Sequence, residues 1–139
     1  MTFVDTNILI DIFQDDLDWC LWSAGRLQAA TEAGPVMIDA IIVAELSRNY
    51  PSLADLMAPI KALSLDIAPI DAETAHMAGR RFAAYRKQRP AGAPPRPLPD
   101  FFIGAHAITQ SVPLLTRDAS IYRTYFPELT LITPEDEHD

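Results

Sequence analysis

Four acidic side chains occupy positions in this sequence that suit chemistry on a phosphate group. Asp5 directly follows a short apolar run, residues 2–4, and precedes a segment with helical apolar spacing. In open α/β sheets, ligands bind in the crevice beyond the carboxyl ends of the strands, so a carboxylate there faces a ligand site. Glu45, Asp100 and Asp118 occur where the chain could bring them to the same crevice. Two carboxylates ~4 Å apart repel by roughly 4 kcal/mol at an effective dielectric constant of ~20, so such a cluster requires a cation.

Helix capping is the alternative explanation for each aspartate, because aspartate is a favoured N-cap. We interpret Asp39 and Asp71, which follow two other apolar runs, as caps. Asp5 and Asp118 differ, since strands one and four of a doubly wound sheet flank the topological switch point, where the turns after them face each other. Asp100 begins a helix, whose dipole alone favours an acid there, so residue pattern alone leaves its role open.

Glu45 is the one candidate that lies within a helix. It shares a helix face with Ile41 and Ile42, and a carboxylate among apolar neighbours is costly to bury unless it is paired or binds a metal. A salt bridge to Arg48 is the alternative. Oxygen ligands without clustered cysteine or histidine favour Mg²⁺ or Mn²⁺ over zinc.

Short apolar runs alternate with helical periodicity along the chain, which predicts a parallel sheet with helices on both faces. Strands are predicted over residues 2–4, 36–38, 67–70, 114–116 and 129–132. Helices are predicted over residues 5–13, 18–33, 40–49, 53–63, 72–89 and 100–110. Residues 89–99 contain five prolines and therefore form a stiff loop rather than a helix.

The composition indicates one globular domain over residues 1–133, followed by an acidic tail over residues 134–139. The chain has 139 residues, 49% of them hydrophobic, and a single cysteine, which excludes an internal disulfide and a cysteine-based metal cluster. No apolar run approaches the ~18 residues of a membrane span, and no signal peptide precedes the first strand. We therefore expect a cytoplasmic protein that does not associate with membranes.

The net charge of −8 argues against nucleic-acid binding until its distribution is considered. The four tail acids and the four candidate site acids together account for all of it. No acid lies between Glu73 and Asp100, and this basic stretch suits contact with RNA phosphates, although a solvated helix face is the alternative for each arginine. The candidate contacts are Arg80, Arg86, Arg89 and Arg96.

Four motifs, taken in their order and spacing, resemble the PIN-domain family. They are DTNILID after the first strand, Ala-Glu45-Leu after the second, Leu-Pro-Asp100 at the start of a late helix, and Leu-Thr-Arg-Asp118 after the fourth strand. The similarity extends from Met1 to about Pro134, and the small size resembles the VapC-type toxins of bacterial toxin–antitoxin pairs.

The resemblance implies a three-layer α/β/α sandwich with a central, mainly parallel sheet of four to five strands. It also implies Mg²⁺- or Mn²⁺-dependent endoribonuclease activity, homodimerisation and inhibition by a small cognate antitoxin. The family's acidic quartet falls on Asp5, Glu45, Asp100 and Asp118, of which we expect Asp5 and Asp100 to be the principal metal ligands. Its supporting polar positions fall on Asn7 and Thr116.

Two other functions stay open at this point. A catalytically silent module of the same fold would bind RNA or a protein without cleaving it, and a structure-specific nuclease would cleave DNA. Turnover that EDTA abolishes separates an enzyme from a binding module. A haloacid-dehalogenase-type phosphatase is disfavoured, because it needs an aspartate where this chain has Asn7.

Overall fold

The computed structural model describes residues 1–93, 95 and 97–137 and contains a five-stranded parallel sheet. The strand order is β3-β2-β1-β4-β5, so the chain starts in the middle, builds outward to one edge, and then crosses to the other side of β1. Its strands are β1 (Thr2–Val4), β2 (Val36–Asp39), β3 (Leu65–Ala68), β4 (Leu114–Leu115) and β5 (Leu131–Ile132). The predicted parallel α/β fold is confirmed, with the reversal of strand order between β1 and β4.

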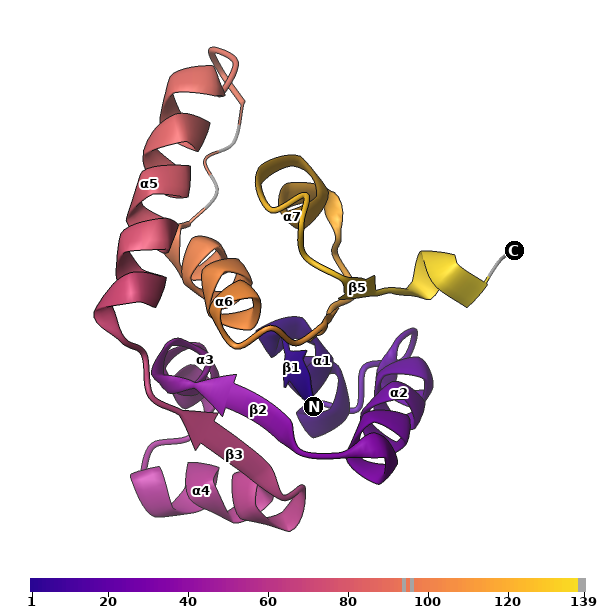
Figure 1. Ribbon diagram of the computed structural model, residues 1–139. Coiled ribbons are helices and arrows are strands. Elements are labelled where there is room, and N and C mark those ends of the chain that lie inside the picture. Colours follow the sequence, from indigo (N-terminus) through magenta and orange to yellow (C-terminus); the bar gives the residue numbers. More distant parts are fainter. Residues whose placement is uncertain (94, 96, 138–139) are drawn as a thin grey trace.

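Helices flank this sheet, α1 packing with α2 and α5 with α6 (Figure 1). The C-terminal half of α5 projects beyond the rest of the fold (Figure 1). The helices are α1 (Thr6–Phe13), α2 (Cys20–Ala33), α3 (Ala40–Leu46), α4 (Leu53–Ala62), α5 (Ala72–Gln88), α6 (Leu98–Thr109) and α7 (Ser120–Tyr125), with short 3-10 helices at Ser47–Asn49 and Pro134–Glu137. Within the described ranges, no helix combines the length and apolar character needed to cross a membrane.

The centre of the sheet is a rigid apolar platform for the residues that follow its strands. Phe3, Val4, Ile38, Leu114 and Leu115 are fully buried. Side chains packed at this density have little freedom to move, so the positions immediately after β1 and β4 are fixed by the sheet itself.

Two aspartates act as helix caps, as the sequence predicted. Asp39 accepts a hydrogen bond from the Ile42 N–H at 3.0 Å at the start of α3. Asp71 accepts one from the Thr74 N–H at 2.9 Å at the start of α5, and this bond lowers the pKa of Asp71.

Several predicted boundaries are wrong, for local reasons. Strand β3 covers residues 65–68 rather than 67–70 and ends before Pro69, which has no N–H to donate to the sheet. Strand β5 begins at Leu131, not at residue 129. Helix α6 begins at Leu98, two residues before Asp100, because Pro99 is tolerated in a first turn. Helix α7 was not predicted, since six residues are too few to show periodicity.

Candidate functional site

The sheet register brings Asp5 and Thr116 together. Val4 of β1 is paired with Leu115 of β4 in a parallel ladder, so the next residue of each strand reaches the same edge. There the Thr116 hydroxyl donates a hydrogen bond to Oδ2 of Asp5 at 2.8 Å. Two residues 111 positions apart in the chain thus become neighbours through strand pairing alone.

A cavity of about 220 Å³ opens at this edge, and the four carboxylates predicted from the sequence all line it. They come from four segments: the residue after β1, the body of α3, the first turn of α6 and the loop after β4. The four acids are Asp5, Glu45, Asp100 and Asp118, and the remaining lining residues are Thr6, Asn7, Ile10, Ile121 and Tyr122. The predicted convergence in one crevice therefore matches the geometry, whereas the role of each residue stays a prediction.

Asp5 is the buried member of the group, with 6% of its surface exposed. Its Oδ1 accepts a hydrogen bond from the Thr6 N–H at 2.8 Å, and its Oδ2 accepts from the hydroxyls of Thr116 at 2.8 Å and Tyr122 at 2.9 Å. Burial, together with the negative charge of Asp100, outweighs these bonds and raises the pKa of Asp5 to about 7. The ionised form of Asp5 is therefore destabilised in the folded protein.

Glu45 and Asp100 are half-buried and Asp118 is exposed. Oε1 of Glu45 accepts a hydrogen bond from the Thr6 hydroxyl at 2.7 Å, which ties α3 to the start of α1. Oδ1 of Asp118 accepts from the N–H of Ser120 at 3.2 Å and from its hydroxyl at 2.9 Å. The Asp118 carboxylate thus stabilises the turn into α7 as well as lining the cavity.

The donor set suits a hard divalent cation in its chemistry, because every candidate ligand is an oxygen. The described groups that shift the pKa of Asp5 include no cation, and the negative charge of Asp100 is among those that raise it. The described residues nevertheless include no group of three acidic, histidine or cysteine side chains close enough together to hold one metal ion. The carboxylates surround the cavity without converging on a single point in it.

Asn7 bridges the start of α1 to the segment after β4. Its Nδ2 donates to Oγ1 of Thr116 at 3.2 Å and lies 3.5 Å from Oδ2 of Asp5, and its Oδ1 accepts from the Arg117 N–H at 3.2 Å. The two predicted supporting residues, Asn7 and Thr116, therefore both contact Asp5 and each other.

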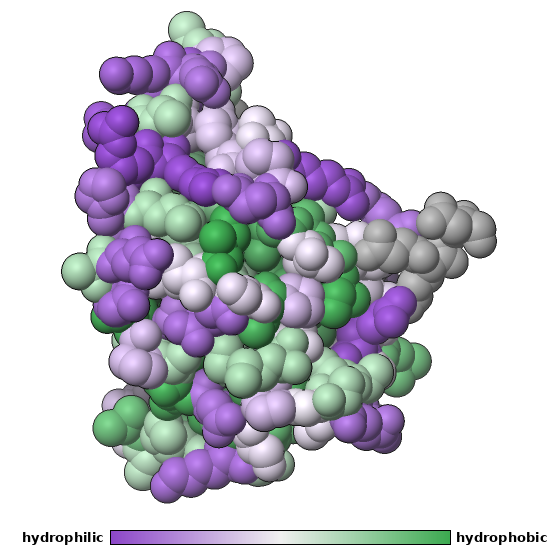
Figure 2. All heavy atoms as spheres, viewed as in Figure 1, coloured by the Kyte–Doolittle hydropathy of each residue, from purple (hydrophilic) through white to green (hydrophobic). Residues whose placement is uncertain are grey.

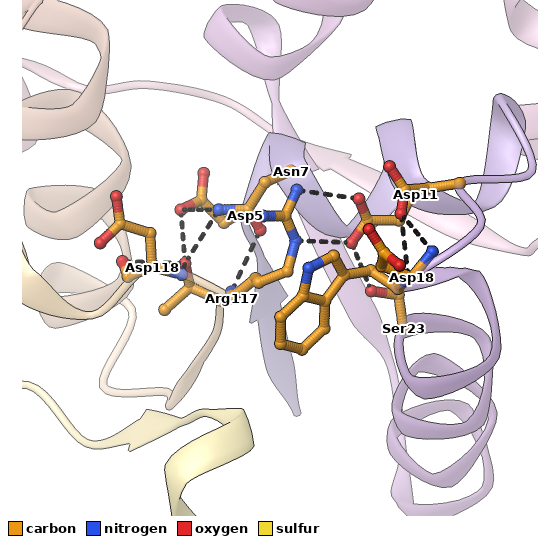
Figure 3. A network of polar contacts seen from close by, with 10 residues as sticks. Asp5, Asn7, Asp11, Asp18, Ser23, Arg117 and Asp118 are labelled. Atoms are coloured by element: carbon orange, nitrogen blue, oxygen red, sulfur yellow. Dashed lines mark hydrogen bonds and ion pairs between the residues drawn. The ribbon is translucent and has the colours of Figure 1, made fainter.

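Sequence reasoning missed an ion pair beside the site. Arg117 donates two hydrogen bonds to Asp11, from Nε to Oδ2 and from Nη2 to Oδ1, each 2.9 Å long. Asp11 is 1% exposed and also accepts from the Ser23 hydroxyl at 2.7 Å. The guanidinium lies over the Trp19 ring, 5.3 Å from its centroid. Figure 3 shows this network connecting the loop of Asp118 to α1 and α2. The available signal was an acid inside an apolar helix, which demands a partner.

A buried hydrogen bond between an aspartate and a histidine lies apart from the cavity. Oδ2 of Asp39 is 2.8 Å from Nδ1 of His106, and both side chains are fully buried. Asp39, unlike Asp5, does not line the acidic cavity.

The basic residues predicted to contact RNA lie on and after α5. Arg80, Arg86 and Arg89 are exposed, and hydrophilic residues are frequent around the upper, C-terminal part of α5, with apolar residues between them (Figure 2). Arg96 lies outside the described residues. None of the three described arginines lines the acidic cavity.

This open parallel sheet, with an acidic cavity at its switch point, defines an α/β/α protein whose acidic cavity lies at the carboxyl ends of β1 and β4. The PIN domain family model matches residues 2–127, and the chain belongs to that family. PIN domains are in general nucleases that use divalent metals. No curated protein sequence matches the chain significantly.

Solved structures share this fold over nearly their whole length. VapBC2 from Rickettsia felis, bound to a DNA fragment from its promoter, is similar with a TM-score of 0.69 and 19% identity, covering 95% of this chain and 97% of that one. A toxin-antitoxin complex from Klebsiella pneumoniae has a TM-score of 0.65 and 25% identity, covering 96% and 98%. DNA-bound VapBC from Salmonella typhimurium has a TM-score of 0.68 and 20% identity, covering 95% and 96%.

Proposed function

We propose that this protein is a Mg²⁺- or Mn²⁺-dependent endoribonuclease and the toxin of a toxin–antitoxin pair. The observation that carries the proposal is the environment of Asp5. A buried carboxylate whose pKa is raised to about 7 faces a cavity that three further carboxylates line. A divalent cation in that cavity would offset this uncompensated negative charge.

Asp5 and Asp100 are the proposed principal ligands, and Glu45 and Asp118 complete the coordination directly or through water. Such an ion, when bound, lowers the pKa of a water molecule and offsets charge on a phosphodiester under attack. Glu45, held by Thr6 through a 2.7 Å hydrogen bond, orients the attacking water. Because no three of these groups are close enough to share an ion in the described residues, the half-buried Asp100 side chain would have to rotate when the ion binds.

Asn7 and Thr116 hold the Asp5 carboxylate in one orientation in this proposal. Both contact its Oδ2, at 3.5 Å and 2.8 Å, and they contact each other. Hydrogen-bond partners of metal ligands fix the ligand orientation and are worth 10–100-fold in metal affinity or activity when they are removed.

RNA is the proposed substrate, and the exposed basic residues of α5 support it. Arg80, Arg86 and Arg89 would hold phosphates that flank the cleaved bond, and such contacts make binding sensitive to salt. DNA cleavage and binding of RNA or protein without cleavage are the alternative functions.

An antitoxin and a second copy of this chain are the proposed partners, and the cytoplasm is the proposed location. Support for the antitoxin comes from the similar structures described above, which include toxin-antitoxin complexes. On this chain, Leu17, which precedes α2, and Leu21, in its first turn, are exposed, and Trp22 is half-buried. They offer apolar surface to an antitoxin helix.

The experiment compares cleavage of labelled RNA and DNA oligonucleotides with Mg²⁺, with Mn²⁺ and with EDTA. Asp5→Asn should lower RNA cleavage more than about 100-fold, since loss of a ligand exceeds the 10–100-fold effect of losing a ligand's partner. Asp71→Asn is the matched control, because it makes the same change at a helix cap outside the cavity, and asparagine caps equally well.

Three results would contradict the proposal. RNA cleavage that persists in EDTA, or that Asp5→Asn leaves intact, would show that the reaction does not depend on a metal ion held by Asp5. Cleavage of DNA but not of RNA would show that DNA is the substrate. RNA binding with no turnover under any metal condition identifies a silent binding module.

A further inference from the structure

Tyr122 is the one residue of the acidic cavity with a buried phenol. It lies on α7, is 1% exposed, and donates a hydrogen bond from its hydroxyl to Oδ2 of Asp5 at 2.9 Å. The contact joins residues 117 positions apart. A tyrosine hydroxyl is protonated at neutral pH and can act as a donor.

The two oxygens of Asp5 therefore have unequal capacity for further bonds. Each carboxylate oxygen has about two lone-pair sites. Oδ2 accepts from the Thr116 hydroxyl at 2.8 Å and from the Tyr122 hydroxyl at 2.9 Å, with the Asn7 amide more distant at 3.5 Å. Oδ1 accepts only the Thr6 N–H, at 2.8 Å, among the hydrogen bonds described for it. The two hydroxyls occupy both lone pairs of Oδ2, whereas one lone pair of Oδ1 is not used by a described hydrogen bond.

We propose that Tyr122 is a positioning residue that fills Oδ2 of Asp5 together with Thr116, so that Asp5 binds the metal ion through Oδ1 alone. The inference rests on the proposed function, because it takes Asp5 as a metal ligand. It goes further by assigning the ligating atom and a role to a residue that the sequence motifs do not include.

Single-oxygen ligation has a consequence for the choice of metal. Mg²⁺ is held octahedrally, and Mn²⁺ favours the same octahedral oxygen sites, whereas Ca²⁺ takes more ligands and accepts both oxygens of one carboxylate. When both lone pairs of Oδ2 are occupied, Asp5 cannot bind an ion through both of its oxygens. Tyr122 then selects Mg²⁺ and Mn²⁺ against Ca²⁺, and removing its hydroxyl frees the second oxygen for Ca²⁺.

The test is calorimetric titration of the purified protein with Mn²⁺ and, separately, with Ca²⁺. Tyr122→Phe should raise the Kd for Mn²⁺ about 10-fold, the lower end of the range for losing a partner that holds a ligand, and should raise the Kd for Ca²⁺ much less. Tyr125→Phe is the matched control: it removes the same atom from the same helix, at a ring that packs on Tyr85 and Phe101 and does not line the cavity. Both affinities should stay at wild-type values in this control.

Thr116 provides an independent variant pair, should Tyr122→Phe fail to fold. Thr116→Val removes the other hydroxyl from Oδ2 and should shift the Mn²⁺ and Ca²⁺ affinities in the same way, whereas Thr116→Ser should not. Equal changes for both ions, or none, in Tyr122→Phe and Thr116→Val would overturn the inference and leave the proposed function standing. A wild-type protein that binds Ca²⁺ but no Mn²⁺ or Mg²⁺ would overturn both.

Discussion

The metal-free protein should lose stability as the pH rises, because of Asp5. The pKa of this carboxyl is 3.8 when it is unperturbed and about 7 in the folded protein, mainly because of burial. A group whose pKa is raised by folding stabilises the folded state fully below its unfolded pKa, and this contribution disappears as the pH rises through the folded value. The pH window is therefore about 4 to 7, and stability falls across it.

The magnitude follows from the shift in pKa. One pKa unit corresponds to 1.36 kcal/mol, so a shift from 3.8 to about 7 corresponds to about 4 kcal/mol over the whole window. Between pH 5 and pH 8 the same linkage gives a loss of about 2.5 kcal/mol. Glu128 does not obscure this range: Arg81 lowers its pKa to about 2, so its contribution to stability is complete above pH 5.

The assay is urea denaturation in EDTA at pH 5 to 8 for the wild type and Asp5→Asn, with Asp71→Asn as control. The asparagine cannot ionise, so the difference in unfolding free energy between wild type and Asp5→Asn separates the contribution of Asp5 from that of every other ionisable group. Wild type should weaken by about 2.5 kcal/mol relative to Asp5→Asn. Mn²⁺ at 100 times its Kd should restore about 2.7 kcal/mol to wild type at pH 8, and none to Asp5→Asn.

A difference between wild type and Asp5→Asn that stays constant from pH 5 to pH 8 would refute this reasoning. It would mean that Asp5 has an ordinary pKa, and that its environment compensates its charge without a metal ion.

Three further predictions concern other parts of the molecule. Arg117→Ala should lower the unfolding free energy by about 3 to 5 kcal/mol in urea melts, because it leaves Asp11 buried and unpaired, and a loss below 1 kcal/mol would contradict this account. Gly104→Ala should lower the unfolding free energy by about 1 to 3 kcal/mol in the same assay, since the added Cβ would lie 3.0 Å from the Phe126 ring. An unchanged unfolding free energy would show that the ring can move. Arg86→Ala should reduce the slope of the logarithm of the RNA association constant against the logarithm of the salt concentration by about 0.7. An unchanged slope would show that Arg86 does not contact an RNA phosphate.

The position of Asp5 beside the residues after β4 could be predicted from the sequence because chain order determines it. Parallel strands end at one edge of the sheet, and the doubly wound strand order places the first strand beside the fourth. The residue type identified Asp5 as a candidate, since an acid directly after a buried strand can be recognised without knowledge of any contact. Thr116 was predicted from the resemblance to the PIN-domain family instead, and it is the next residue after β4.

Partners from distant helices could not be predicted in this way. Tyr122 reaches Asp5 only because α7, six residues long, packs at this edge of the sheet. Arg117 and Asp11 were both visible as charges, but their pairing depends on the direction of two side chains 106 positions apart in the chain. Pattern analysis identifies the face of an element, and packing decides which side chains on neighbouring faces meet.

Asp39 and Asp5 show where the sequence reaches its limit. Each follows a parallel strand, and each caps the helix that comes next. Oδ2 of Asp39 has a hydrogen-bond partner in Nδ1 of His106, 67 positions later in the chain and 2.8 Å away. The described groups that shift the pKa of Asp5 include no cation. Only the fold shows which of the two carboxylates lines the acidic cavity.

The different partners of Asp11 and Asp5 support the function proposed at the end of the first strand. Asp11, which does not line the cavity, gains a cationic partner in Arg117. Asp5 instead receives only neutral donors, which fix its orientation without offsetting its charge. Sites kept for function commonly sacrifice stability in this way. A cation bound in the cavity would offset the negative charge of Asp5 as Arg117 offsets that of Asp11.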